Sequence, residues 1–436
     1  MLCVKKEVNR MIKKSEQIIK TLKYNIRLPS FMEGNRMSEK DFTRNRKLPF
    51  PQLINFLLSS PKHTLQKELT CFIQKSSDFS NVSKSAFCQQ RIKLKPKAFI
   101  ELNEVLINEF YTDNTINVWN DFRLLAIDGS TLELPPSLEI LEKFGYNNKV
   151  NFTPMAKIST CYDLLNEIVL DSEINPNKTN EYSMALKHIK KLKKTDLLIM
   201  DRGYGARWLF NHLSLKKINY VVRIQHNFGE DIDSFWDSKE NSSIIEINSL
   251  PKKSELRIKE LGMEFVPFKI RLVKFKLENN KVEMLATSLL DEEKYPLEIF
   301  KDIYGLRWGV ETNYNHLKNH VEIGNFTGFL PIIIKQDFYA SMLISNIQTL
   351  ILRDAHEELQ KKKQDNKYKY KINRNLSLGF LKEKVVDILV SDNPKFMEEL
   401  KKLFQLEPVP IRNGRKFERK DQKYRKKYYI NQRRAL

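Results

Sequence analysis

Apolar residues recur at helical spacing through the first 110 residues of the chain. One apolar stripe lies in LPFPQLINFLLSS, and a second runs through HTLQKELTCFIQK. The turn formers of SSDFSN interrupt the pattern, and SKSAFCQQRIKL restarts it with Ser83 as the expected N-cap. This is the outline of a helix-turn-helix, although any small helical bundle gives the same pattern. The polar side chains that the second helix would present are Lys84, Gln89, Gln90, Arg91 and Lys93.

Short β-rich runs alternate with helical patterns between residues 120 and 225, which predicts an α/β fold. Strands are expected at 122–128, 131–134, 157–164, 167–174, 196–200 and 220–224. Helices are expected at 181–193 and 205–216. Three or four strands followed by helix, strand, helix and strand have the order of the ribonuclease H fold. This match depends on no sequence motif.

The segment 226–290 holds four further β-like runs: SIIEINSL, ELRIKEL, FKIRLVKFKL and KVEMLATSLL. Because the preceding core needs only a connection here, a mostly β insertion outside the core sheet is expected. Helical patterns follow at about 296–320, 335–362 and 376–404, with a charged linker at 363–374.

The balance of charge points to a polyanionic partner. The 436 residues include 75 Lys and Arg against 54 Asp and Glu, a formal charge of +21. The excess is greatest at 411–436, where three tyrosines lie among the basic residues, and this segment either contacts nucleic acid or is a solvated tail. There is no apolar run long enough for a membrane span, no secretory h-region and no CxxC pair among the four cysteines, so a cytoplasmic protein with reduced thiols is expected.

Two aspartates follow apolar runs of the predicted sheet. Asp128 follows Leu124–Ile127 in FRLLAIDGSTLELP, and Asp201 follows Leu197–Met200 in LLIMDRGYG. An Asp at the carboxyl end of a central strand lies where α/β folds bind ligands, although such residues often only cap the next turn. Arg202 and Tyr204, beside Asp201, either face a ligand or brace the loop.

A third acidic position lies on a polar helical stripe. In YGLRWGVETNYNHLK, Tyr304, Arg307, Glu311 and Lys318 fall at i, i+3, i+7 and i+14, within about 60° of one another on a helix. One carboxylate flanked by two cations suits metal binding beside a phosphate, whereas a single Arg–Glu pair would be a surface ion pair. Trp308 points off this stripe and is expected to pack in the core.

Together these residues resemble the catalytic residues of bacterial insertion-sequence transposases. Asp128, Asp201 and Glu311 look like the DDE triad, and the spacing of the stripe is similar to the YREK signature of the cut-and-paste subfamily that forms hairpin ends. The resemblance extends from about residue 41 to the basic C-terminus. It implies a ribonuclease H-like core interrupted by a β-rich insertion, and Mg²⁺ (with Mn²⁺ as a substitute) held by the three acids. It also implies cleavage of the inverted-repeat ends, joining to target DNA, and a homodimer in the synaptic complex.

The resemblance also implies roles for the remaining site residues and a division of the chain. Tyr304, Arg307, Lys318, Arg202 and Tyr204 would contact DNA, and the protein would associate with the bacterial nucleoid. The expected regions are a helical DNA-binding part at 1–110, the catalytic core at 111–225, the insertion at 226–290, the last catalytic helices at 291–362 and a basic region at 363–436.

Two alternatives remain open from the sequence. One is a metal-dependent nuclease of the same fold that cuts without joining, and the other is a non-catalytic DNA-binding regulator. His316 and His320 have the i, i+4 spacing of a metal pair, but His316 lies about 140° around the helix from Glu311, so a joint site is not expected. No nucleotide-binding glycine motif occurs.

Overall fold

The computed structural model describes residues 14–44, 47–59, 64–75, 82–112, 116–147, 152–226, 228–277, 280–362 and 368–412. Its strands are β1 (Arg123–Glu133), β2 (Met155–Asp163), β3 (Ile168–Pro176), β4 (Asp196–Met200), β5 (Asn219–Ile224), β6 (Ser242–Ile247), β7 (Phe268–Lys276), β8 (Val282–Thr287), β9 (Tyr370–Lys371) and β10 (Val409–Pro410). Its first helices are α1 (Lys14–Arg27), α2 (Pro29–Asn35), α3 (Phe50–Leu58), α4 (Leu65–Lys75), α5 (Lys84–Arg91), α6 (Lys97–Phe110), α7 (Leu138–Phe144), α8 (Glu181–Ile189) and α9 (Arg207–Leu215). The later helices are α10 (Glu230–Asp237), α11 (Lys252–Glu260), α12 (Glu298–Leu306), α13 (Trp308–His316), α14 (Pro331–Lys362), α15 (Arg374–Val390) and α16 (Lys395–Phe404).

Eight strands form one mixed sheet in the order β3-β2-β1-β4-β5-β8-β7-β6. β1, β4 and β5 run parallel, β2 pairs antiparallel with β1, and β3 pairs antiparallel with β2. On the other side, β8, β7 and β6 add an antiparallel meander to β5. The α/β class and the alternation of strands and helices between 120 and 225 are therefore confirmed.

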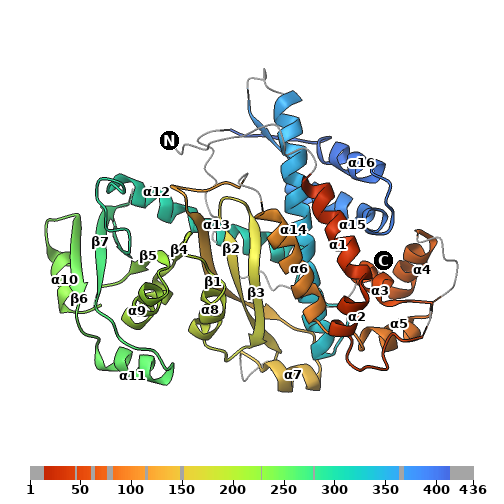
Figure 1. Ribbon diagram of the computed structural model, residues 1–436, viewed down its shortest axis with the longest axis horizontal. Coiled ribbons are helices and arrows are strands. Elements are labelled where there is room, and N and C mark those ends of the chain that lie inside the picture. The colour runs from red at the N-terminus through yellow and green to blue at the C-terminus, as the bar shows by residue number, and fades with distance from the viewer. Residues whose placement is uncertain are drawn as a thin grey trace.

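Two expectations about strands were wrong. The Asp-Gly-Ser segment does not separate two strands, because β1 continues through it and stays paired with β2 from Leu125 to Glu133. The segment 226–290 does not lie outside the core sheet, because β8 pairs with β5 from Val221 to Ile224. This segment also carries two helices, α10 and α11, so it is an α/β extension of the sheet edge (Figure 1).

Helices cover both faces of the sheet, as the alternation of side chains along β1 shows. Leu125 and Ile127 pack with residues of α8 and α9, whereas Leu124 packs with α12 and Ala126 belongs to the cluster that contains α14. α14 is buried over most of its 32 residues and lies beside α6 in Figure 1. Its Asn346 fixes it to β3: Val169 N–H donates to Asn346 Oδ1 at 2.9 Å, and Asn346 Nδ2 donates to Val169 O at 2.8 Å.

The N-terminal helices and the C-terminal helices α15 and α16 share one hydrophobic cluster with α14. They lie at the end of the molecule opposite β6 and β7 (Figure 1). Lys23 of α1 joins these two parts of the chain by an ion pair with Asp392 at 2.9 Å. Among the described residues, no helix combines the length and apolar character that a membrane crossing requires.

Candidate active site

Asp128 lies inside β1, which corrects its expected place at the end of a strand. It is two residues beyond Ala126, the last residue of β1 that pairs with β4, and its side chain shares the phase of Ala126 on the face covered by α12–α14. Gly129 N–H donates to Asp128 Oδ1 at 2.8 Å. The carboxylate therefore lies just beyond the point where β1 stops pairing with β4, although β1 still pairs with β2.

Asp201 directly follows β4, as the sequence predicted. Its backbone is extended, so its side chain continues the phase of Leu197 and Ile199, which pack in the cluster of α12. Gly203 N–H donates to Asp201 Oδ1 at 2.9 Å, which caps the short 3-10 turn Arg202–Tyr204. Asp201 thus both caps the 3-10 turn and lies at the end of β4, at the mouth of the sheet.

Glu311 projects from α13, the helix that packs on β1. Arg307 Nη2 donates to Glu311 Oε1 at 2.8 Å. The expected continuous helix at 296–320 is divided: α12 ends before Arg307, α13 begins after it, and a π-helical turn occupies Leu317–Val321. Arg307 nevertheless keeps helical backbone angles, and it is 8% exposed.

The three carboxylates interact electrostatically although they are distant in the sequence. The pKa of Asp128 is raised to about 6, chiefly by burial and also by the negative charges of Asp201 and Glu311, against the opposing effects of the Gly129 N–H and Arg307. Like charges that disfavour one another in this way are the situation that a bound cation relieves. Carboxylate oxygens are also the ligands that Mg²⁺ prefers. The donor set therefore fits a divalent metal ion in its chemistry.

Within the described ranges, no three His, Cys, Asp or Glu side chains are gathered closely enough to hold a metal ion as they stand. The Arg307–Glu311 ion pair engages Oε1 of the Glu311 carboxylate on its own helix.

The remaining residues of the stripe face the same region as Glu311. The Arg307 guanidinium lies 5.7 Å from the centre of the Tyr304 ring, and Tyr304 is 6% exposed. Lys318 Nζ donates to Ser130 Oγ at 2.6 Å, so it reaches β1 two residues beyond Asp128. The sequence did not indicate that Ser130 would receive this contact.

Two aromatic residues have environments that differ from expectation. Trp308 is 49% exposed, so its expected role in the core was wrong; it lies on the outer side of α13 with the Arg307 guanidinium 5.3 Å from its ring. Tyr204 is buried and packs edge-on against Tyr182, whose hydroxyl donates to Gly203 O at 2.7 Å. Tyr204 therefore braces the loop after Asp201, whereas Arg202 is exposed.

The residues expected on a DNA-reading helix divide into buried and exposed groups. Arg91 is 1% exposed and donates to Gln336 Oε1 at 2.7 Å, and it also forms an ion pair with Asp337. Arg91 therefore joins α5 to α14, Gln90 is also buried, and assigning these two residues to DNA contact was wrong. Lys84 and Gln89 are exposed, and Lys93 is partly buried near Asp41. The intervening SSDFSN turn lies outside the described residues, as does the basic tail beyond residue 412.

His316 is a core residue of α13. Its Nε2 lies 3.1 Å from Gln348 Oε1 on α14, and burial lowers its pKa to about 3. Tyr314, on the same helix, was not singled out from the sequence. Its hydroxyl donates to the main-chain O of Asp128 at 2.7 Å, which joins the helix of Glu311 to the strand of Asp128.

The comparisons with known proteins place this site in a family. The family model described as Transposase DDE domain matches residues 119–347, more than half of the chain, and this range contains Asp128, Asp201 and Glu311. The protein is accordingly an enzyme that acts on DNA. The chain belongs to the transposase DDE domain family, and it is a DNA transposase. Membership implies dependence on a divalent metal ion.

Two known proteins illustrate the similarity. The transposase InsG of insertion sequence element IS4 from Escherichia coli (strain K12) is 20% identical over 390 residues, which cover 86% of each chain. A solved structure of the piggyBac transposase synaptic complex with hairpin DNA gives a TM-score of 0.44 at 14% identity, and the match covers 90% of this chain and 79% of that one.

Proposed function

We propose that this transposase cuts the ends of its element and joins them to target DNA with Asp128, Asp201 and Glu311 as the catalytic carboxylates. The observation that carries the proposal is that Asp128 on β1 experiences the charges of both Asp201, at the end of β4, and Glu311 on α13. We further assign β3-β2-β1-β4-β5 to a ribonuclease H-like core. The reason is that these five strands are neighbours in the sheet, and along the chain they alternate with helices in the order expected for that fold.

Mg²⁺ bound by the three acids would promote ionisation of the attacking water or 3′-hydroxyl and neutralise charge on the scissile phosphate. Groups of the protein itself orient the carboxylates. Asp128 is held by the Gly129 N–H and Asp201 by the Gly203 N–H, so both carboxylates are oriented before any ligand arrives. Glu311 accepts from Arg307 in the absence of the ion.

Binding of the ion by Glu311 would release Arg307 for DNA. A guanidinium released from Glu311 can contact a phosphate through two parallel hydrogen bonds, and Lys318 adds a point charge beside it. Tyr304 lies under the guanidinium and limits its movement. Because these residues match the YREK spacing, we propose that the second strand is attacked by the first 3′-hydroxyl to give a hairpin end.

Other parts of the chain would contribute binding. Exposed Lys84 and Gln89 on α5 and exposed Arg202 beside Asp201 are proposed DNA contacts, and the whole enzyme is proposed to act as a homodimer on two terminal inverted repeats. Lys84→Ala should weaken DNA binding and reduce its salt dependence, because one phosphate contact is lost. A Lys84→Ala variant that binds with wild-type affinity would remove α5 from the interface.

The deciding experiment sizes the products formed from labelled linear DNA that carries the sequence flanking the coding region, with and without Mg²⁺. Wild-type protein should give nicked, hairpin and joined products, whereas Asp201→Asn should bind the DNA and give none of them. Asp302→Asn is the matched control, because Asp302 is an exposed aspartate on α12. Cutting without hairpins or joining would favour the nuclease, and binding without any cutting would favour the regulator.

A further inference from the structure

A buried chain of polar side chains connects the opposite face of the sheet to Asp128. His188 of α8 is fully buried, with Nδ1 at 2.7 Å from Asp171 Oδ2 on β3 and Nε2 at 3.1 Å from Ser159 Oγ on β2. Ser159 Oγ in turn donates to the main-chain O of Asp128 at 3.0 Å. We propose that Ser159, His188 and Asp171 are positioning residues that hold the catalytic Asp128, an inference that rests on the proposed role of Asp128.

Counting hydrogens determines the protonation of His188. The Ser159 hydroxyl has one hydrogen, which is used on the Asp128 carbonyl, so the bond between Ser159 and His188 needs a hydrogen on Nε2. An ionised Asp171 can only accept, so Nδ1 carries a hydrogen as well. The proposed direction of the chain therefore requires a hydrogen on both ring nitrogens of His188. A neutral ring would leave either the bond to Asp171 or the bond to Ser159 without a hydrogen.

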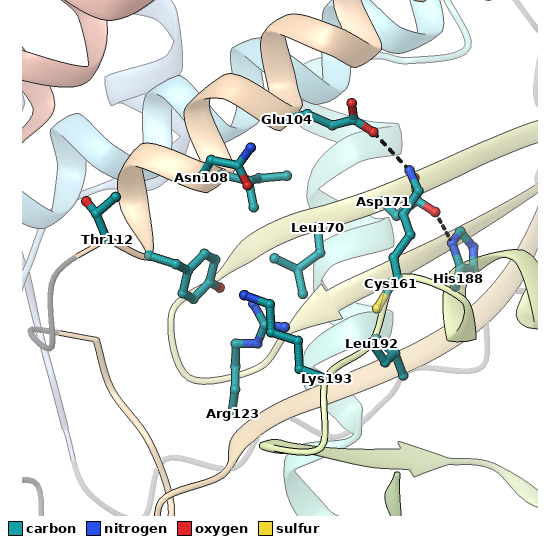
Figure 2. Close-up of a pocket in the computed structure, with 13 residues that line it drawn as sticks. Glu104, Asn108, Thr112, Arg123, Cys161, Leu170, Asp171, His188, Leu192 and Lys193 are labelled. Atoms are coloured by element: carbon teal, nitrogen blue, oxygen red, sulfur yellow. Dashed lines mark hydrogen bonds and ion pairs between the residues drawn. The ribbon is translucent and has the colours of Figure 1, made fainter. Parts of the chain in front are cut away.

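The surroundings support an ionised Asp171. Burial by itself would raise the pKa of Asp171, but the hydrogen bond and charge of His188 and the charge of Lys191 lower it. Lys191 Nζ lies 3.0 Å from Asp171 Oδ1 and 3.1 Å from Glu104 Oε1. Figure 2 shows His188 and Asp171 joined at the wall of a cavity of about 450 Å³, which is also lined by Cys161. The charged end of the chain therefore borders a cavity and is not enclosed in the apolar core.

The geometry at Asp128 explains what the chain achieves. The parallel pairing of β1 with β4 ends at Ala126, so Asp128 lies beyond it. Its carbonyl accepts one hydrogen bond from Ser159 and another from Tyr314 on α13. Ser159 lies on the same face of β2 as Cys161, which packs in the cluster of α8 and α9. Donors from both faces of the sheet thus fix one peptide group. Because the carboxylate is attached to the same residue, its direction relative to Glu311 is fixed as well.

The first test measures the rate of end cleavage at saturating DNA for Ser159→Ala, with Ser172→Ala as a matched buried serine on β3. Loss of an outer-shell partner typically reduces activity about 10- to 100-fold, so Ser159→Ala should be at least about tenfold slower with unchanged DNA affinity. Ser172→Ala should keep the wild-type rate. Equal rates for both variants, or a loss confined to DNA affinity, would overturn the proposal.

The second test needs no activity and uses the wild-type protein. The ¹⁵N spectrum of histidine-labelled protein, assigned with His188→Gln, should show both ring nitrogens of His188 protonated. A neutral His188 ring would overturn the proposed direction of the chain even if Ser159→Ala failed to fold. An active Asp128→Asn variant would instead refute the proposed function, so the two failures can be told apart.

Discussion

The carboxylate of Asp128 should reduce the stability of the metal-free transposase, and Asp128→Asn should restore it. The pKa of Asp128 is raised to about 6, first by burial and then by the charges of Asp201 and Glu311, from an ordinary value of 3.8. A folded pKa above the unfolded one means that the stabilising proton is fully bound below about pH 4 and is lost as the pH rises through about 6. The asparagine variant has no such proton to lose, and its Oδ1 can still accept from Gly129 N–H.

The size of the effect follows from the same pKa difference. Each tenfold change in proton affinity corresponds to about 1.4 kcal/mol, so the metal-free protein should lose about 2–3 kcal/mol between about pH 4 and pH 8. For a chain of this length, that corresponds to a change of about 3 °C in the unfolding temperature. Asp128→Asn should therefore be more stable than the wild type at about pH 8, while cleavage is abolished.

The assay is thermal unfolding in chelator at several pH values, repeated with Mg²⁺. The stability gain of Asp128→Asn should grow from about pH 4 and be complete above about pH 6, and Mg²⁺ should stabilise the wild type more than the variant, because the cation relieves the repulsion among the acids. Asp302→Asn, on the exposed side of α12, should show no pH-dependent gain. A gain of equal size at about pH 4 and pH 8, or no gain at all, would refute the electrostatic account of the site.

Three further predictions address the residues around the site. Arg307→Ala should reduce hairpin formation and strand transfer at least about tenfold more than the first nick, as measured on gels. Stabilisation by Mg²⁺ should remain, because Glu311 is freed from its ion pair. Equal loss at every step, together with loss of the Mg²⁺ effect, would make Arg307 a structural residue. Arg91→Ala should cost about 3–5 kcal/mol in unfolding experiments, because Asp337 loses its buried partner; a change below about 1 kcal/mol would contradict this. Tyr204→Phe should keep both stability, within about 1 kcal/mol, and the cleavage rate, because the hydroxyl is buried and has no hydrogen-bond partner among the described residues; a slow but stable variant would contradict this.

The succession of strands and helices along residues 120–225 was predictable from the sequence because the local pattern of apolar residues reports burial. The boundaries of β4 matched the expected 196–200, and β5 began one residue before the expected 220. The failures concern pairing across distance. Asp, Gly and Ser form turns in isolation, yet antiparallel pairing with β2 carries β1 straight through Asp128–Ser130. The runs in 226–290 indicated strands but not that β8 would join β5.

In the candidate site, too, local sequence patterns were informative, whereas contacts between residues distant in the sequence were missed. The three acids were proposed from two apolar runs that each precede an Asp, from helical spacing and from the family resemblance, and burial was not needed to propose them. Burial did decide the roles of Arg91 and Trp308. Arg91 is polar in sequence, but its partners on α14 lie 245 and 246 residues away, and no local pattern reveals them. The hydrogen bond from Ser159 to Asp128 was missed for a similar reason, since it depends on the pairing of β2 with β1.

The joining of β8 to β5 determines how far the segment 226–290 can be treated as a module. Removing it would uncover the side of β5 from Val221 to Ile224, where the apolar residues are buried, and would break the 2.9 Å ion pair between Arg223 and Glu283. It would also remove the Thr287 hydroxyl that donates to Tyr220 O at 2.7 Å. A shortened enzyme or a domain graft must therefore keep β8 with the core. Replaceable sequence begins only past β8 across the sheet, in the direction of β6.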